Sequence, residues 1–175
     1  MSDLKDFRPS RRGFLGLAGG AAALSLSAPA PARAQALQTK AKIVILGAGA
    51  AGAGMANRLV ERLEGAEITI LDGRKQHWYQ PGFTLIASGL KPASYSVSGT
   101  GDWLPKGVKW VEDYAANIDP DAQLVTTQGG EKLAYDYLIL ATGLSLDWAA
   151  IEGFSLDQVG QNGIGAVYAG PDYAA

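Results

Sequence analysis

Residues 43–52, Ile-Val-Ile-Leu-Gly-Ala-Gly-Ala-Ala-Gly, decide the fold of this chain. The stretch opens with a short apolar run rich in β-branched residues, which is the pattern of a buried parallel strand. Glycines follow at once with the spacing G-x-G-x-x-G, and residues 50–63 then show a helical pattern. A second apolar run covers Glu67–Asp72. We therefore predict a βαβ unit with a right-handed crossover.

The glycines of this turn have distinct roles in a dinucleotide site. Gly47 permits the tight turn, Gly49 lets the backbone approach a pyrophosphate, and Gly52 allows the helix to pack close to the strand. The first helical residues, Ala50 and Ala51, present free N–H groups where the helix dipole favours negative charge. The predicted ligand is a dinucleotide with its pyrophosphate at this helix N-terminus.

An acidic residue completes the motif at the end of the second strand. Asp72 follows Gly52 by twenty positions and is expected to accept hydrogen bonds from ribose hydroxyls. Its charge opposes a 2′-phosphate, so NADP is disfavoured although Arg74 and Lys75 lie nearby. Gly73 and Arg74 are included in the predicted site.

The rest of the chain predicts further elements around this unit. Between the second strand and residue 107 we expect a loop at Gly73–Pro81, a short helix at Gly82–Gly89 and a surface excursion at Ala93–Thr100. Later we expect three short strands, Val108–Ile118, Gln123–Thr127 and Lys132–Ala134, and a second buried strand at Tyr137–Ala141 that ends in Thr142-Gly143. The fold class is α/β, a Rossmann-like domain with a parallel sheet and an inserted three-stranded β-meander, incomplete in this chain.

The N-terminal segment has the features of an export signal. Ser10–Leu15 reads Ser-Arg-Arg-Gly-Phe-Leu, the twin-arginine pattern; an apolar stretch and a small-x-small cleavage site at Ala34–Ala36 follow. We predict a signal peptide at residues 1–36, a cofactor-binding domain at residues 37–175, and a periplasmic location. The twin-arginine route carries folded proteins with their cofactor already bound, which favours a tightly held flavin over a freely exchanging nicotinamide pool.

Composition excludes several functions. Five of the 15 basic and two of the 17 acidic residues lie within residues 1–36, so the remainder carries ten basic and fifteen acidic residues. This balance argues against nucleic acid as a partner. The chain has no cysteine and one histidine, His77, which argues against a disulfide framework and a zinc site; no metal is expected.

Three segments resemble known flavoproteins. Tyr135–Gly143, an apolar strand ending in Ala-Thr-Gly, is similar to a strand of two-dinucleotide-domain flavoproteins. His77–Leu85, with its Tyr-Gln-Pro core, resembles a loop of mitochondrial-type sulfide:quinone oxidoreductases, and Leu146–Gly153 resembles a later segment of that family. The resemblance spans about residues 40–175.

This resemblance implies FAD as cofactor, sulfide as electron donor and quinone as acceptor. The predicted cofactor-binding residues are Gly47, Gly49, Ala50, Ala51, Gly52, Asp72, Gly73, Arg74, Gln80, Pro81, Ala115, Thr142 and Gly143. Asp72 stands where the family more often has Glu. No catalytic residue is assigned, because His77 is expected beside the site rather than as a base. Trp148 lies near the flavin or in the core.

The resemblance also shows what this chain lacks. The family is expected to use a pair of redox cysteines, a second dinucleotide-type domain and a C-terminal membrane-associating region. Some members carry a cysteine near the position of Ala166. We therefore expect an N-terminal part of a longer flavoprotein that is inactive alone and has membrane contact only through a C-terminal region not included here.

Three alternatives remain open at this point. The chain is also consistent with the flavoprotein subunit of a sulfide dehydrogenase that donates to cytochrome c. An NADH:quinone-type flavoenzyme is disfavoured by the export signal. A non-catalytic nucleotide-binding fragment would exchange its nucleotide freely.

Overall fold

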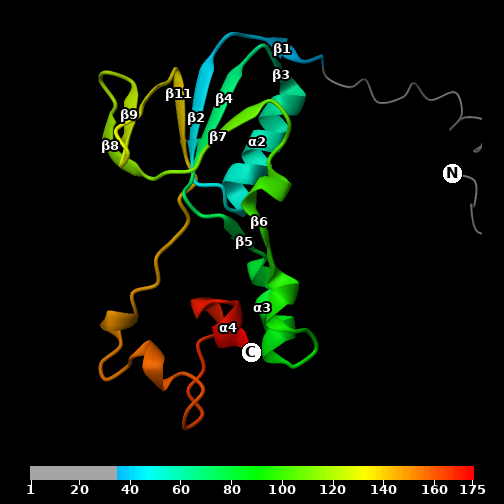
Figure 1. The fold of residues 1–175 in the computed structure, drawn as a ribbon, viewed down its shortest axis with the longest axis vertical. Helices are drawn as coiled ribbons and strands as arrows, with labels where there is room; N and C mark the ends of the chain where they lie inside the picture. Colours follow the sequence, from blue (N-terminus) through cyan, green and yellow to red (C-terminus); the bar gives the residue numbers. More distant parts are fainter. Residues whose placement is uncertain (1–34) are drawn as a thin grey trace, which may run out of the picture. The chain divides into compact units, whose positions relative to one another are not determined.

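A four-stranded parallel sheet with the order β11-β2-β4-β7 forms the centre of the fold (Figure 1). The computed structural model describes residues 35–175; the twin-arginine motif at residues 10–15 lies outside them. The strands are β2 (Lys42–Leu46), β4 (Glu67–Leu71), β7 (Val108–Val111) and β11 (Tyr137–Leu140). Helix α2 (Ala50–Arg62) connects β2 to β4, so the predicted βαβ unit is confirmed.

The two faces of β2 belong to two different cores. Ile43 and Ile45 pack with Ile70 beneath α2, whereas Val44 and Leu46 pack toward the meander. This division follows from the two-residue period of a strand. Because both faces are covered, β2 is apolar along nearly its whole length.

Helix α2 meets the sheet through small side chains. Its buried residues are Gly52, Ala53 and Ala56. Leu59 packs partly against the same core, whereas Met55 is exposed. The close approach of helix and strand thus places small residues at the centre of the buried face.

The antiparallel meander is confirmed with one correction. It consists of β8 (Ala115–Asp119), β9 (Leu124–Thr127) and β10 (Lys132–Ala134) in the order β10-β9-β8, and it packs across the sheet from α2 (Figure 1). The predicted single strand Val108–Ile118 is wrong, since it divides into β7 of the parallel sheet and β8 of the meander. The break falls at residues 112–114, where Asp113 accepts backbone hydrogen bonds from Tyr114 and Gly129.

A small antiparallel ribbon replaces two segments predicted to be irregular. Strand β5 (Gln76–Trp78) pairs with β6 (Val97–Gly99), with His77 opposite Ser98. Consequently, Ala93–Thr100 is not a surface excursion: Ser96 and Thr100 are both buried. The sequence hid this ribbon because its strands are only three residues long and are separated by the intervening turns and α3.

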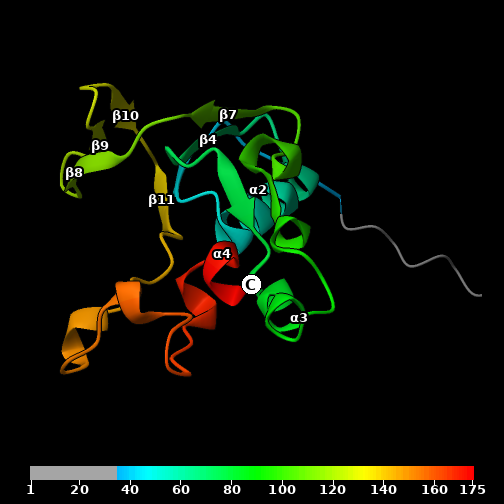
Figure 2. The same ribbon diagram turned by 60° about the horizontal axis from the view of Figure 1, so that its bottom comes forward.

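Short elements complete the described part. Strand β1 (Leu37–Gln38) pairs with β3 (Leu63–Glu64). Helix α3 (Phe83–Ala87) lies in the predicted short helix and packs with α4 (Pro171–Ala174) in a small core around Phe83 (Figure 2). The 3-10 turns cover Gln80–Gly82, Ala93–Ser96, Thr100–Trp103, Trp148–Ala150, Leu156–Gln158 and Val167–Ala169.

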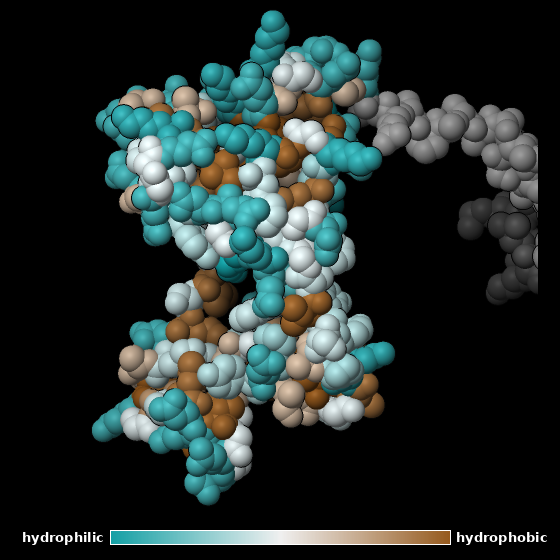
Figure 3. Space-filling view, viewed as in Figure 1, coloured by the Kyte–Doolittle hydropathy of each residue, from teal (hydrophilic) through white to brown (hydrophobic). Residues whose placement is uncertain are grey.

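Strand β11 lies at the edge of the sheet, which changes the expected burial of Tyr137–Ala141. It pairs in parallel with β2. However, Tyr137 and Leu140 are exposed on this outermost strand. Exposed apolar residues continue at Leu144 and Ile151 in the following segment, and the space-filling view shows apolar residues reaching the surface there (Figure 3).

Within residues 35–175, no helix has the length and apolar character needed to cross a bilayer.

Candidate functional site

The glycine-rich turn joins the carboxyl ends of three strands. The Gly47 N–H donates to the Leu71 carbonyl at 2.9 Å, and the Ala141 N–H donates to the Leu46 carbonyl at 2.8 Å. Gly47 has φ 100°, and a Cβ added there would lie 2.4 Å from the carbonyl oxygen of Ala141. Only glycine satisfies both the positive φ and the close approach, so Gly47 makes the tight turn that was predicted for it.

The other two glycines of the motif differ in their surroundings. A Cβ on Gly52 would lie 1.8 Å from the Gly47 carbonyl oxygen, so close helix–strand packing is confirmed at this position. By contrast, a Cβ on Gly49 would meet only Nη2 of Arg74, at 3.8 Å. The Gly49 backbone therefore faces open space. Its approach to a pyrophosphate remains a prediction, for which this space is suitable.

The N-terminus of α2 lies beside that open space. Gly49 is the N-cap, and no acidic residue occupies the first turn of the helix. The helix itself thus contributes no carboxylate that would compete for the free N–H groups of its first turn. This arrangement suits an anionic group such as a pyrophosphate.

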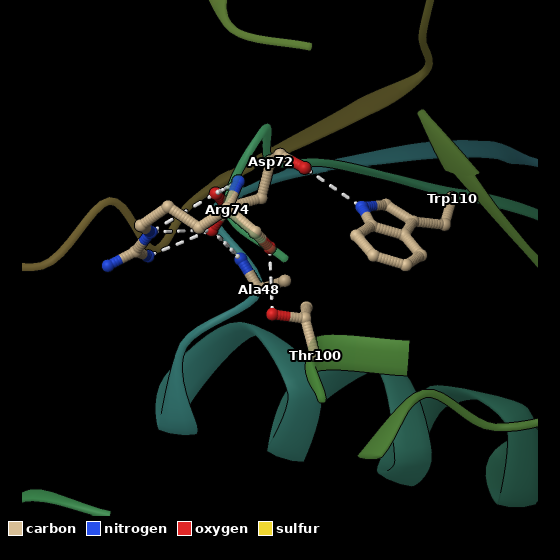
Figure 4. Close-up of polar contacts among 5 residues, drawn as sticks. All are labelled: Ala48, Asp72, Arg74, Thr100 and Trp110. Carbon is tan, nitrogen blue, oxygen red and sulfur yellow. Dashed lines mark hydrogen bonds and ion pairs between the residues drawn. The ribbon is translucent and has the colours of Figure 1, made fainter. Parts of the chain in front are cut away.

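Asp72 is bound by the chain on both carboxylate oxygens (Figure 4). Oδ2 accepts hydrogen bonds from the Ala48 N–H at 2.7 Å and from Nη2 of Arg74 at 2.8 Å. Oδ1 accepts from the Arg74 N–H at 2.9 Å and from Nε of Arg74 at 3.1 Å. The side chain is 4% exposed. A ribose hydroxyl at this carboxylate would have to share oxygens that are already occupied.

The electrostatics of Asp72 follow from these contacts. Burial by itself raises the pKa of the carboxyl, but hydrogen bonds from the Arg74 side chain and from the Ala48 and Arg74 N–H groups outweigh it and lower the pKa below its usual value. In turn, the hydrogen bond to Asp72 raises the pKa of Arg74, against the opposing effect of its own partial burial. Both groups are charged at neutral pH.

The backbone after β4 is fixed by two residues that the sequence did not indicate. The Thr100 hydroxyl donates to the Arg74 carbonyl at 2.7 Å, and Nε1 of Trp110 donates to the Asp72 carbonyl at 2.8 Å (Figure 4). The Thr100 N–H also donates to the Lys75 carbonyl at 2.9 Å. Residues 72–75 are therefore held in place from β7 and from the turn after β6.

A pocket of about 1040 Å³ opens at these strand ends. Its size lies at the upper end of the usual range for ligand pockets, roughly 300–1,000 Å³. The predicted residues that line it are Gly49, Ala50, Ala51, Asp72, Arg74, Gln80, Pro81, Thr142 and Gly143. The structure thus brings together the glycine-rich turn, the end of β4, the Gln-Pro loop and the turn after β11.

Four predicted residues do not line this pocket. Gly47 and Gly52 allow the tight turn and its close packing but are not lining residues. A Cβ on Gly73 would meet the ring of Tyr114 at 2.4 Å, so Gly73 gives space to that ring. Ala115 begins β8 and is not among the lining residues. Ala115 was predicted within a single strand, Val108–Ile118, and instead begins the meander after the division into β7 and β8.

The loop that follows β4 contributes a further wall. Gln76, His77, Trp78 and Tyr79 line the pocket ahead of Gln80 and Pro81. The His77 ring lies 5.6 Å from that of Trp103, and its place beside the site rather than as a base remains a prediction. Trp148 packs on Phe154 at 5.5 Å and is not a lining residue.

Comparisons with known proteins identify relatives of this chain. The family model of the pyridine nucleotide-disulphide oxidoreductases matches residues 41–166. A mitochondrial sulfide:quinone oxidoreductase of Mus musculus is 37% identical over 112 residues, or 62% of this chain and 25% of that protein. One from Dictyostelium discoideum is 34% identical over 102 residues, covering 58% and 22%.

A solved structure agrees with the fold. The sulfide:quinone oxidoreductase of Aquifex aeolicus superposes with a TM-score of 0.54 and 29% sequence identity, covering 62% of this chain and 25% of that chain. The matched region therefore spans about a quarter of the relatives' own length.

Proposed function

Since the chain belongs to the pyridine nucleotide-disulphide oxidoreductase family, we propose that it forms the FAD site of an enzyme that oxidises sulfide and reduces quinone. The family's cofactor is FAD, and its members are oxidoreductases. The choice of sulfide and quinone rests on the similarity to the named relatives and on the His77–Leu85 segment.

One observation carries the FAD site: two distant parts of the sequence meet at one pocket. The glycine-rich turn at residues 47–52 and the Ala-Thr-Gly turn at residues 141–143 lie side by side, because β2 and β11 are paired in parallel. Open space faces Gly49, while Gly47 and Gly52 leave no room for a side chain. A pyrophosphate fits at the start of α2, where the backbone can approach it closely.

The proposed chemistry divides between the cofactor and the chain. FAD, when bound, supplies a two-electron carrier between donor and acceptor. The residues of this chain bind it, orient it and shield it with the wall at residues 76–81. In the proposed sulfur chemistry, sulfide attacks a cysteine disulfide, which breaks the S–S bond and gives a persulfide and a thiolate; these 175 residues contain no cysteine. We therefore assign FAD binding to this chain and sulfur chemistry to cysteines outside it.

The first test is FAD binding by the purified full chain. Fluorescence and visible absorption after reconstitution and desalting should show retained FAD. A colourless protein after reconstitution would overturn the FAD assignment.

The second test concerns sulfide. Under anaerobic conditions, the FAD-loaded chain should bleach with sulfide no faster than free FAD does, because it lacks the thiol. Rapid bleaching by the cysteine-free chain would contradict this division of roles.

We further propose export to the periplasm by the twin-arginine route, on the strength of residues 10–15. Replacing Arg11 and Arg12 with Lys should leave the chain in the cytoplasm of a bacterial host, as measured by cell fractionation. Unchanged export of the double variant would contradict the route.

A further inference from the structure

The acidic residue of the dinucleotide motif, Asp72, forms an ion pair with Arg74, which differs from the contact that the motif predicts. The motif predicts that the carboxylate faces the ribose. Here the carboxylate turns toward the chain: it accepts from the Ala48 N–H, the Arg74 N–H and the Arg74 guanidinium. An aspartate is one methylene shorter than glutamate, which keeps its oxygens close to the turn.

The guanidinium of Arg74 occupies the position beside the glycine-rich turn. Its Nη2 lies 3.8 Å from where a Cβ of Gly49 would be, which is the place kept open for a pyrophosphate. The Arg74 side chain is 55% exposed and lines the pocket. Thus the exposed charged group at this wall of the pocket is the Arg74 guanidinium, whereas the Asp72 carboxylate is buried.

The hydrogen-bonding capacity of Arg74 is only partly used. A guanidinium has five N–H donors. Within residues 35–175, the recorded bonds of this side chain use Nε and Nη2 toward Asp72 and none uses Nη1 (Figure 4). One edge of the fork is held by the carboxylate, and Nη1 remains available to a ligand.

The direction of the side chain is fixed from two sides. Thr100 holds the Arg74 carbonyl, and Asp72 holds the guanidinium. An arginine ordered in advance loses less entropy when it binds an anion. Arginine also suits phosphate better than lysine does, because its planar fork can form two parallel hydrogen bonds.

We propose that Arg74 contacts the pyrophosphate of FAD and that Asp72 acts on the cofactor through Arg74, as a positioning residue and not as the ribose acceptor. This inference rests on the proposed FAD site. It changes the role of the motif's acidic residue and makes Arg74 the main side-chain contact of the pyrophosphate.

The test is a double-variant cycle on FAD binding, measured by flavin fluorescence with the full chain. Arg74→Gln should weaken FAD binding by about 10- to 100-fold, the value of a charged hydrogen bond. Asp72→Asn should also weaken it. In the Arg74→Gln background, however, Asp72→Asn should change the affinity by no more than about twofold, because residues that act through one contact are not additive.

Salt dependence separates this contact from a structural effect. Loss of a guanidinium–phosphate contact should flatten the dependence of the FAD dissociation constant on ionic strength. Arg74→Lys, which keeps the charge but loses the fork, should lie between wild type and Arg74→Gln. Lys106→Gln is the matched control: it removes one exposed positive charge that does not line the pocket, and its affinity should equal that of wild type.

The outcomes are distinguishable. Wild-type chain that binds no FAD would overturn the proposed function. If wild type binds FAD and Arg74→Gln binds it equally well, only this inference is wrong. If Asp72→Asn weakens binding as much without Arg74 as with it, Asp72 contacts the ribose directly and the inference is likewise wrong.

Discussion

The α-carbon of Gly52 faces the carbonyl oxygen of Gly47 so closely that a Cβ on Gly52 would lie 1.8 Å from that oxygen. The same helix contains Gly54, where a Cβ would meet nothing within 4 Å. Position 52 therefore has no room for a side chain, whereas position 54 has. The glycine-rich turn depends on one of them and not on the other.

We expect Gly52→Ala to lower the free energy of unfolding by about 3 kcal/mol or more, because helix α2 must move away from the turn. Gly54→Ala should leave it unchanged or raise it by about 0.5–1 kcal/mol, since alanine favours the helix. Urea denaturation followed by tryptophan fluorescence measures both. Equal stability of the two variants would contradict the packing described for Gly52.

Gly49→Val separates cofactor binding from folding. A side chain at residue 49 meets only the flexible end of Arg74, so the stability of the chain should fall by less than about 1 kcal/mol. The valine would fill the space proposed for the pyrophosphate, and FAD retention after desalting should be lost. Retention equal to wild type would place the cofactor elsewhere.

Thr100→Val removes the hydroxyl that holds the Arg74 carbonyl and conserves the shape of the side chain. We expect a loss of about 1–3 kcal/mol of stability, because a partly buried acceptor loses its partner. FAD affinity should also decrease, since the backbone of Arg74 becomes less ordered. Calorimetric titration at equal folded fraction distinguishes the two effects; an unchanged melting temperature would contradict the first.

The lowered pKa of Asp72 predicts a specific acid response. A carboxylate with a lowered folded-state pKa contributes stability that is fully present above its unfolded value, about 3.9, and is lost as pH falls through the folded value. Wild-type stability should therefore decrease below about pH 4, whereas between pH 5 and 7 the contribution of this group is complete and should not change with pH. Asp72→Asn should give a shallower decrease below pH 4 in urea titrations. Asp113 also has a lowered pKa, through hydrogen bonds from Thr127, Gly129 and Tyr114, so part of the decrease should remain.

Ser96→Ala should stabilise the chain. The Ser96 hydroxyl is buried, and no hydrogen-bond partner is recorded for it within the described part of the chain. Removing a buried hydroxyl without a partner is expected to raise the free energy of unfolding by about 1 kcal/mol. Ser98→Ala is the contrasting variant, because the Ser98 hydroxyl accepts from Nε1 of Trp103 at 2.8 Å and its loss should destabilise. A destabilised Ser96→Ala protein would indicate a hydrogen bond at Ser96.

The sequence predicted the parts of the fold that local chemistry specifies. The strand–turn–helix at residues 43–62 could be predicted because an apolar strand, the glycine spacing and the start of a helical pattern follow one another there. The strand β11 was also predicted, from its apolar run at residues 137–141.

Features that depend on contacts between distant residues could not be predicted from local sequence patterns. The division between β7 and β8 depends on the Asp113 side chain, which bonds Gly129 across the meander. Thr100 has no local pattern that marks it, and it reaches Arg74 only because β5 and β6 pair. The orientation of Asp72 depends on the guanidinium of Arg74 and on the Ala48 N–H, and the motif by itself indicates only that a carboxylate is present.

The pairing of Leu46 with Leu140 has a consequence for the order of events during synthesis. The wall formed by residues 141–144 is 94 positions further along the chain than the turn at residue 47. Contacts between such distant residues form slowly, since a long loop must close first. The ribosome must therefore release residue 144 before the pocket has all its walls. A cofactor that needs those walls can be loaded only after residues 141–144 have left the ribosome.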